Sequence, residues 1–270
     1  MRVAAVQMNS GPRLDANLER CAKLLREAAA RGAGLVVLPE NFSLMPASEG
    51  NRIAAAEQDG AGPAQAFLSA QARQMGLWMV GGTLPMRAQG GARVRASSLV
   101  FDNRGRRVAR YDKIHLFDVE LDSDEAYRES DAIEPGPVTA NLICIDTPAG
   151  RLGLSVCYDL RFPELYRRLS ADGAELFAVP SAFTATTGHA HWEPLLRARA
   201  IENLAYVVAS GQCGRHASGR HTHGHSLIVD PWGRILSELD SGEGVVTADI
   251  DREIVTSLRR RFPALQHRRI

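Results

Sequence analysis

Several features that would mark a class of function are missing from the sequence. No stretch approaches the roughly 18 uninterrupted apolar residues of a membrane-spanning helix. The first apolar run is soon followed by Asn9 and Ser10, so it is too short for the core of a signal peptide. A net charge of +1 provides no large field that would attract a polyanion. We therefore predict a cytoplasmic protein that binds neither a membrane nor nucleic acid.

Paired cysteines are missing as well. The sequence contains four cysteines, Cys21, Cys144, Cys157 and Cys213. Because they are widely separated and form no C-x-x-C pair, they indicate neither a disulfide framework nor a thiolate zinc site. Each cysteine must therefore be judged by its surroundings, and all except Cys157 are expected to be core or near-core residues.

The histidines are the group that could indicate a metal. His221, His223 and His225 alternate along an expected strand, which would place three imidazoles on one face, and His189 and His191 precede them. The metalloprotease motif H-E-x-x-H is absent. We predict adventitious metal binding at the alternating histidines, no catalytic metal and no cofactor.

The pattern of apolar residues predicts an α/β fold with a mixed sheet, in one domain over residues 1–270. Short β-branched runs predict strands buried on both faces at residues 3–8, 35–38, 77–80, 142–145, 152–156, 176–179 and 205–209. Helical patterns occupy residues 63–75, 163–171 and 191–203, and Asp15 is expected to cap an earlier helix. Residues 97–101 and 106–111 predict a hairpin, and the acidic residues 115–137 predict a long loop over a site.

Cys157 lies between an expected strand and a helix that begins near Pro163. A thiol on such a turn is exposed at the carboxyl end of a strand, where open α/β sheets bind ligands and where backbone N–H groups can hold an oxyanion. The alternative is a buried structural cysteine, the usual fate of a free thiol. The neighbourhood of Cys157 alone does not decide between them.

Glu40 and Lys113 also follow expected strands. Desolvation at the edge of the core would raise the pKa of Glu40 and suit it to act as a general base, whereas the alternative is an exposed acid that closes a strand. The ammonium of Lys113 could stabilise an oxyanion, whereas the alternative is a surface lysine. Each residue on its own is a weak indication.

Taken together and in this order, these motifs resemble the nitrilase (carbon–nitrogen hydrolase) superfamily. The resemblance covers nearly the whole chain and rests on Val3-Ala4-Ala5-Val6-Gln7-Met8, Leu38-Pro39-Glu40-Asn41, Asp112-Lys113-Ile114-His115-Leu116-Phe117, Val156-Cys157-Tyr158-Asp159-Leu160-Arg161-Phe162-Pro163-Glu164 and Gly224-His225-Ser226. It implies a four-layer α-β-β-α sandwich that dimerises to extend to eight layers. A homodimer or higher homo-oligomer is therefore expected.

The resemblance also implies a thiol amidase that acts on a small-molecule amide. It assigns Glu40 as base, Cys157 as nucleophile, and Lys113 with the backbone N–H of Tyr158 as the oxyanion site. A second catalytic glutamate is expected in the loop after Lys113. Glu129 matches its usual place, and Glu125 and Glu120 stay open.

Further motifs resemble the Nit branch, particularly its deaminated glutathione amidases. They run through residues 180–184, 189–192, 195–202 and 211–216, and they suggest Phe183, Thr184 and His191 as pocket residues. Arg161 could grip a substrate carboxylate with two parallel hydrogen bonds, or it could pair with Glu164. An omega-amidase acting on 2-oxoglutaramate and a carbamoyl amino acid hydrolase are alternative activities. A metal-dependent amidohydrolase and a catalytically silent binding module are the rival classes.

Overall fold

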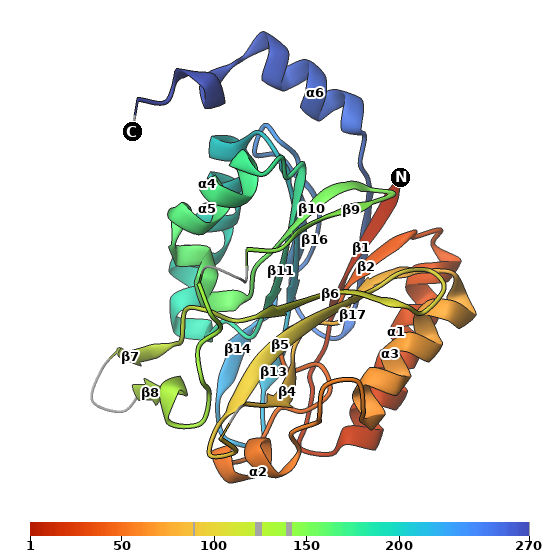
Figure 1. Ribbon diagram of the computed structural model, residues 1–270, viewed down its shortest axis with the longest axis vertical. Coiled ribbons are helices and arrows are strands. Elements are labelled where there is room, and N and C mark those ends of the chain that lie inside the picture. Colours follow the sequence, from red (N-terminus) through yellow and green to blue (C-terminus); the bar gives the residue numbers. More distant parts are fainter. Residues whose placement is uncertain (89, 122–125, 139–141, 270) are drawn as a thin grey trace.

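Two mixed β-sheets pack face to face and are covered on their outer faces by helices, which gives four layers (Figure 1). This computed structural model describes residues 1–88, 90–121, 126–138 and 142–269. The predicted α-β-β-α sandwich is confirmed. No helix of the described residues is long and apolar enough to cross a membrane.

The first sheet joins the two ends of the chain. Its strand order is β17-β1-β2-β3-β5-β4, with β6 pairing against β5. The strands are β1 (Arg2–Gln7), β2 (Leu35–Val37), β3 (Trp78–Val80), β4 (Leu84–Arg87), β5 (Val94–Phe101), β6 (Arg107–Asp112) and β17 (Gly244–Asp249). β1, β2 and β3 are parallel, and β17 runs antiparallel to β1. The predicted hairpin is confirmed as the antiparallel pair of β5 and β6.

The second sheet has the strand order β16-β15-β12-β11-β10-β9. Its strands are β9 (Cys144–Thr147), β10 (Gly150–Leu154), β11 (Leu176–Ser181), β12 (Tyr206–Gly211), β15 (Ser226–Val229) and β16 (Ile235–Leu239). β10, β11 and β12 pair in parallel. β9 pairs antiparallel with β10, β15 with β12, and β16 with β15. Both sheets therefore have a parallel centre, whose carboxyl strand ends can carry a site.

Alternation along β1 explains how the layers are held together. Val3 and Ala5 pack into the apolar core between the two sheets, whereas Ala4 and Val6 pack beneath the helices on the other face. All four side chains are fully buried. This is why the strand is apolar without alternation, as the sequence predicted.

The helices that cover the sheets are α1 (Leu14–Ala30) and α3 (Pro63–Met75) on one side and α4 (Pro163–Ala171) and α5 (Ala185–Asn203) on the other (Figure 1). α2 (Glu49–Ala54) and α6 (Arg252–Arg261) were not predicted. The bounds of α3 and α4 match the prediction, because each begins with proline at a permitted first-turn position. The expected cap of α1 is wrong: the cap position is Arg13, and Asp15 lies inside the first turn.

Two other predictions need correction. α5 begins at Ala185 rather than at residue 191, because the side chain of Thr184 caps it by accepting the Thr187 N–H. The expected loop 115–137 contains a small hairpin of β7 (Asp118–Glu120) and β8 (Ala126–Arg128), followed by a 3₁₀ turn, Glu129–Asp131. A further hairpin joins β13 (Cys213–Arg215) to β14 (His221–His223).

Candidate active site

Three residues that are far apart in the sequence meet where strands of the two sheets end. Glu40 follows β2 and Lys113 follows β6 in the first sheet, and Cys157 follows β10 in the second. Their exposed fractions are 3%, 2% and 5%, respectively. The structure thus excludes the surface alternatives for Glu40 and Lys113.

The ammonium of Lys113 is shared between two carboxylates. Its Nζ lies 2.9 Å from Oε1 of Glu40 and 2.9 Å from each carboxylate oxygen of Glu129. The second oxygen of Glu40 accepts the Ala182 N–H at 2.8 Å, and Glu129 accepts the Phe117 N–H at 2.7 Å. Two carboxylates and one ammonium leave these three side chains with a net negative charge, which disfavours a thiolate at a neighbouring cysteine and leaves a carboxylate beside it that can accept a proton.

The backbone around Glu40 is closely packed. Gly82 has a φ of +52°, and a Cβ there would lie 2.0 Å from the Pro39 carbonyl oxygen, so only glycine allows this approach. The side-chain amide of Gln212 donates to the Glu40 carbonyl at 3.0 Å. Together these contacts fix the position from which the Glu40 carboxylate extends.

The predicted direction of the Glu40 pKa shift is wrong. Burial alone would raise this pKa, but the charge and the hydrogen bond of Lys113 outweigh burial, with smaller contributions from Arg220 and the Cys157 thiol, so the pKa of Glu40 is lowered. Glu40 is therefore a carboxylate at neutral pH. In that form it can accept a proton.

The pKa of the Cys157 thiol is shifted in the opposite direction. Burial and then the charge of Glu40 raise its pKa, against the opposing effects of Lys113 and Arg220. The thiol is therefore protonated at rest, and it lies close enough to the Glu40 carboxylate for each group to shift the pKa of the other. Cys157 has a φ of +49°, a strained conformation for a side chain with a Cβ, and such conformations concentrate at functional sites.

Asp159 holds the turn that carries Cys157. It is fully buried and accepts hydrogen bonds from the Tyr111 hydroxyl at 2.6 Å and the Val156 N–H at 2.8 Å. Its other oxygen accepts the His115 N–H at 3.2 Å and lies 2.7 Å from Nδ1 of His115. Asp159 thus ties the residues on either side of Lys113 to the Cys157 turn.

We expect Asp159→Ala to lower the free energy of unfolding by about 3 kcal/mol, because it leaves buried donors on Tyr111 and Val156 without an acceptor. Turnover should fall at least about tenfold as the Cys157 turn loosens. Chemical denaturation and kcat measure the two effects. Asp230→Ala is the matched control, because Asp230 accepts the Trp232 and Arg234 N–H groups in the turn after β15. A turnover loss as large in the control would contradict a specific role for Asp159.

The lowered pKa of Glu40 predicts the pH dependence of activity. The carboxylate persists below its ordinary pKa of 4.5, so the acid limb of kcat/KM should lie below pH 4.5. The same depressed pKa gives stability that is present above pH 4.5 and lost as the pH falls through the folded-state value. A pH–rate profile, with unfolding followed at each pH, measures both. An acid limb between pH 5 and 7 in folded protein would count against Glu40 as the base.

The residues predicted to bind substrate also come together. Tyr158, Phe183 and Thr184 line a narrow pocket with Cys157. The Arg161 guanidinium lies 5.7 Å from the Tyr158 ring centroid and 5.3 Å from that of Phe183. It also lies 3.3 Å from Nδ1 of His191. Among the described residues, Arg161 forms no ion pair with Glu164.

Arg220 is a residue of this site that the sequence interpretation missed. It lines the Cys157 pocket, together with Phe117 and Thr187. Nothing in its sequence neighbourhood distinguishes it from the many other arginines. The contact arises because β13 and β14 bring it to the pocket from far along the chain.

The three candidates for the second glutamate are in different positions. Glu129 touches Lys113 from the 3₁₀ turn after β8. Glu120 is exposed on β7, and Glu125 lies outside the described residues. Its contact with Lys113 therefore favours Glu129 over Glu120 as the second glutamate of the site.

The alternating histidines do not form the predicted triad. β14 ends at His223, and positive φ angles at Gly224 and His225 turn the chain away. The His223 and His225 rings still stack, with centroids 4.3 Å apart. In the part of the chain that the structure describes, the group of three side chains with metal-ligand spacing is instead His225, Glu238 and Asp240. Burial, then His225 and His189, lowers the pKa of His223 to about 4.

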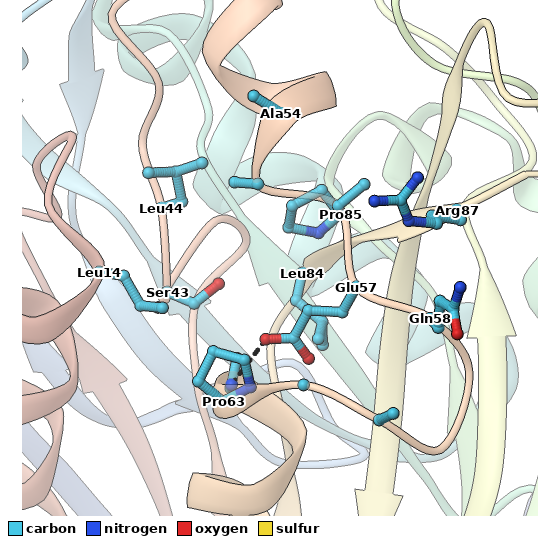
Figure 2. Close-up of a pocket in the computed structure, with 15 residues that line it drawn as sticks. Leu14, Ser43, Leu44, Ala54, Glu57, Gln58, Pro63, Leu84, Pro85 and Arg87 are labelled. Atoms are coloured by element: carbon cyan, nitrogen blue, oxygen red, sulfur yellow. Dashed lines mark hydrogen bonds between the residues drawn. The ribbon is translucent and has the colours of Figure 1, made fainter.

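A separate hollow of about 520 Å³ lies beside the start of α3 (Figure 2). Its carboxylate, Glu57, accepts the N–H groups of Ala64 at 2.6 Å and Gln65 at 3.2 Å. Glu57 thereby supplies the cap that Gly62, at the N-cap position of α3, has no side chain to provide. The acid in this hollow is therefore engaged in holding the helix.

Known proteins are similar to this chain in sequence and fold over nearly its whole length. The carbon–nitrogen hydrolase family profile matches residues 2–260. A Yersinia enterocolitica protein named deaminated glutathione amidase is 43% identical over 99% of this chain and 92% of its own. The Caenorhabditis elegans NitFhit crystal structure aligns with a TM-score of 0.91 and 37% identity over 99% of this chain and 65% of that one. The structure of Saccharomyces cerevisiae Nit3, a member of branch 10 of the nitrilase superfamily, aligns with a TM-score of 0.89 and 33% identity. The alignment covers 100% of this chain and 97% of that one. The chain belongs to the carbon–nitrogen hydrolase family.

Proposed function

We propose that Cys157 is the nucleophile of an amide hydrolase with Glu40 as its base. The observation that carries this proposal is a buried, protonated thiol beside a buried carboxylate that an adjacent ammonium, 2.9 Å away, keeps ionised. A thiol with a raised pKa reacts only if its proton is removed as it attacks, and Glu40 is in place to take it.

The reaction would proceed through a thioester. Glu40 takes the thiol proton while Sγ bonds to the amide carbon, and Lys113 and the Tyr158 N–H hold the oxyanion. The carbon–nitrogen bond then breaks, and the amine leaves with the proton from Glu40. Water attacks the thioester after giving a proton to Glu40 or Glu129. The sulfur is then expelled and takes that proton back from the glutamic acid, which restores the thiol and releases a carboxylic acid.

We propose deaminated glutathione as the substrate, because a relative that is 43% identical over nearly its whole length carries that name. Its acyl half is a 2-oxo acid, and its leaving amine is cysteinylglycine. The Arg161 guanidinium, which among the described residues is within ion-pair distance of no carboxylate, is a suitable partner for the carboxylate of the 2-oxo acid.

The test is a substrate panel with wild type and Cys157→Ala. Deaminated glutathione, 2-oxoglutaramate, carbamoyl amino acids and simple nitriles are compared by kcat/KM, with products identified by mass spectrometry. We expect the wild type to have its highest kcat/KM with deaminated glutathione, and we expect Cys157→Ala to be inactive with every substrate. A higher kcat/KM for 2-oxoglutaramate would make the protein an omega-amidase. Activity that survives in the variant but is lost on chelation would favour a metal enzyme.

The family resemblance also supports a homodimer and a cytoplasmic location as proposals. Sedimentation velocity across a range of concentrations tests the first. Fractionation of cells that express the full chain tests the second.

A further inference from the structure

A cleft of about 680 Å³ opens beside the Cys157 pocket, within the size range of small-molecule sites, roughly 300–1,000 Å³. Its polar lining includes Ser48, Glu49, Arg52, Tyr127, Thr186 and Arg220. Arg220 lines both the cleft and the Cys157 pocket, and the Phe117 ring of the pocket packs 5.1 Å from the Tyr127 ring of the cleft. The two spaces therefore adjoin at Arg220.

Arg220 brings a positive charge to this junction, where it helps to lower the pKa of Glu40 without forming a direct ion pair. Its guanidinium lies 5.0 Å from the Tyr127 ring centroid and 6.0 Å from that of Phe117, and Nη2 donates to the Ala182 carbonyl at 2.5 Å. Among the described residues, no carboxylate lies within ion-pair distance of it, and its buried Nε has no hydrogen-bond partner. A buried N–H donor without an acceptor costs free energy. A ligand that supplies an acceptor to Nε of Arg220 would therefore recover that free energy on binding.

The other arginine of the cleft is already engaged. Arg52 donates to Glu49 at 2.8 Å and to Oδ1 of Asn41 at 3.0 Å. Arg220 is thus the better partner for an incoming anion. Guanidinium suits a carboxylate in particular, since it can form two parallel hydrogen bonds with it.

Thioester chemistry favours the amine half of the substrate as the occupant of the cleft. The acyl half stays bonded to Cys157 after the amide breaks, whereas the amine must depart. The Cys157 pocket is narrow, about 10 Å³, so an amine the size of a dipeptide needs the adjoining space. A dipeptide spans about 7 Å when extended, which the cleft can accommodate.

The geometry points to this cleft as the subsite for the leaving amine, with Arg220 as the specificity-determining residue that binds a carboxylate on that amine. The inference rests on the proposed thiol amidase function and deepens it. The preferred substrates are then amides whose amine half is a small acidic peptide, and primary amides that release ammonia leave this contact unused.

The test compares two substrates that differ only in that carboxylate: deaminated glutathione and its C-terminal carboxamide. Wild type should favour the acid in kcat/KM by about ten- to a hundredfold, the range for a hydrogen bond to a charged group. Arg220→Gln should bring the two substrates within about twofold of each other. Arg220→Lys keeps the charge without the paired geometry and should retain part of the preference. Arg215→Gln, an exposed residue of β13 outside the cleft lining, should keep all of it.

Each outcome has a distinct meaning. A wild type without preference for the acid, or a preference that survives in Arg220→Gln, overturns the inference. So does an equal loss on both substrates, which would assign Arg220 to the acyl half or to the fold. If Arg220→Gln does not fold, the full wild-type preference in Arg220→Lys overturns it and a reduced one supports it. If wild type hydrolyses neither substrate nor 2-oxoglutaramate, the proposed function itself has failed.

Discussion

Cys157→Ala is expected to abolish amide hydrolysis, with kcat lowered about ten-thousandfold or more. Without the sulfur there is no thioester, and the remaining groups could only assist direct attack by water, a much slower path. The fold should survive, because the change removes one atom from a buried side chain. Turnover of deaminated glutathione, followed by release of cysteinylglycine, measures the effect.

Cys144→Ala is the matched control for that substitution. Cys144 is a half-buried thiol on β9, in the same sheet, and should keep wild-type turnover when replaced. Intact-protein mass spectrometry during turnover should show the acyl adduct in the wild type and in the control. Turnover within about tenfold of wild type in folded Cys157→Ala would rule out Cys157 as the nucleophile.

Lys113→Met is expected to remove both activity and much of the stability. The buried Glu40 and the partly buried Glu129 would be left without their shared cation, at a cost of about 3–5 kcal/mol in unfolding free energy. Loss of the oxyanion partner should lower kcat about a hundred- to a thousandfold in the fraction of the variant that folds. Chemical denaturation and steady-state kinetics measure the two losses.

The pH dependence of unfolding separates this explanation from simple loss of packing. In the wild type, the lowered pKa of Glu40 makes stability fall as the pH drops below 4.5. In Lys113→Met, burial without the cation would raise the pKa of Glu40 above its value in the unfolded chain, so stability should increase as the pH falls. Lys23→Met, at an exposed position of α1, should behave like the wild type. A variant whose stability falls with acid as in the wild type would contradict the account.

Local chemistry explains which elements the sequence could predict. α3 and α4 were predictable to the residue because proline marks their first turn, and Gly76 ends α3 in the left-handed region. The first turns of α5 contain Gly188 and His189, which are weak helix formers. What favours a glycine there is tertiary: a Cβ on Gly188 would lie 2.4 Å from the Cβ of His223.

The residues of the site also divide into those that the sequence could predict and those that depend on tertiary contacts. Glu40, Lys113 and Cys157 each follow an expected strand, and they were recognisable because the motifs that contain them, taken together and in this order, resemble those of one superfamily. The pKa of Glu40 was not predictable, because burial and an ion pair shift it in opposite directions and the partner lies 73 residues away. Arg220 has no sequence signal, since its importance comes from two pockets that exist only in the fold.

The pairing of β1 with β17 has a consequence for how the chain acquires its structure. Arg2 lies opposite Asp249, and the amino group of Met1 donates to the Ile250 carbonyl at 2.7 Å. Contacts between residues so distant in sequence are slow to form, because the loop between them must first be closed. During synthesis β1 is made before β17, so the edge of β1 that pairs with residues 244–249 stays open until those residues have left the ribosome. The first sheet is therefore completed only after β17 has been made, and until then the growing chain carries an unpaired strand edge.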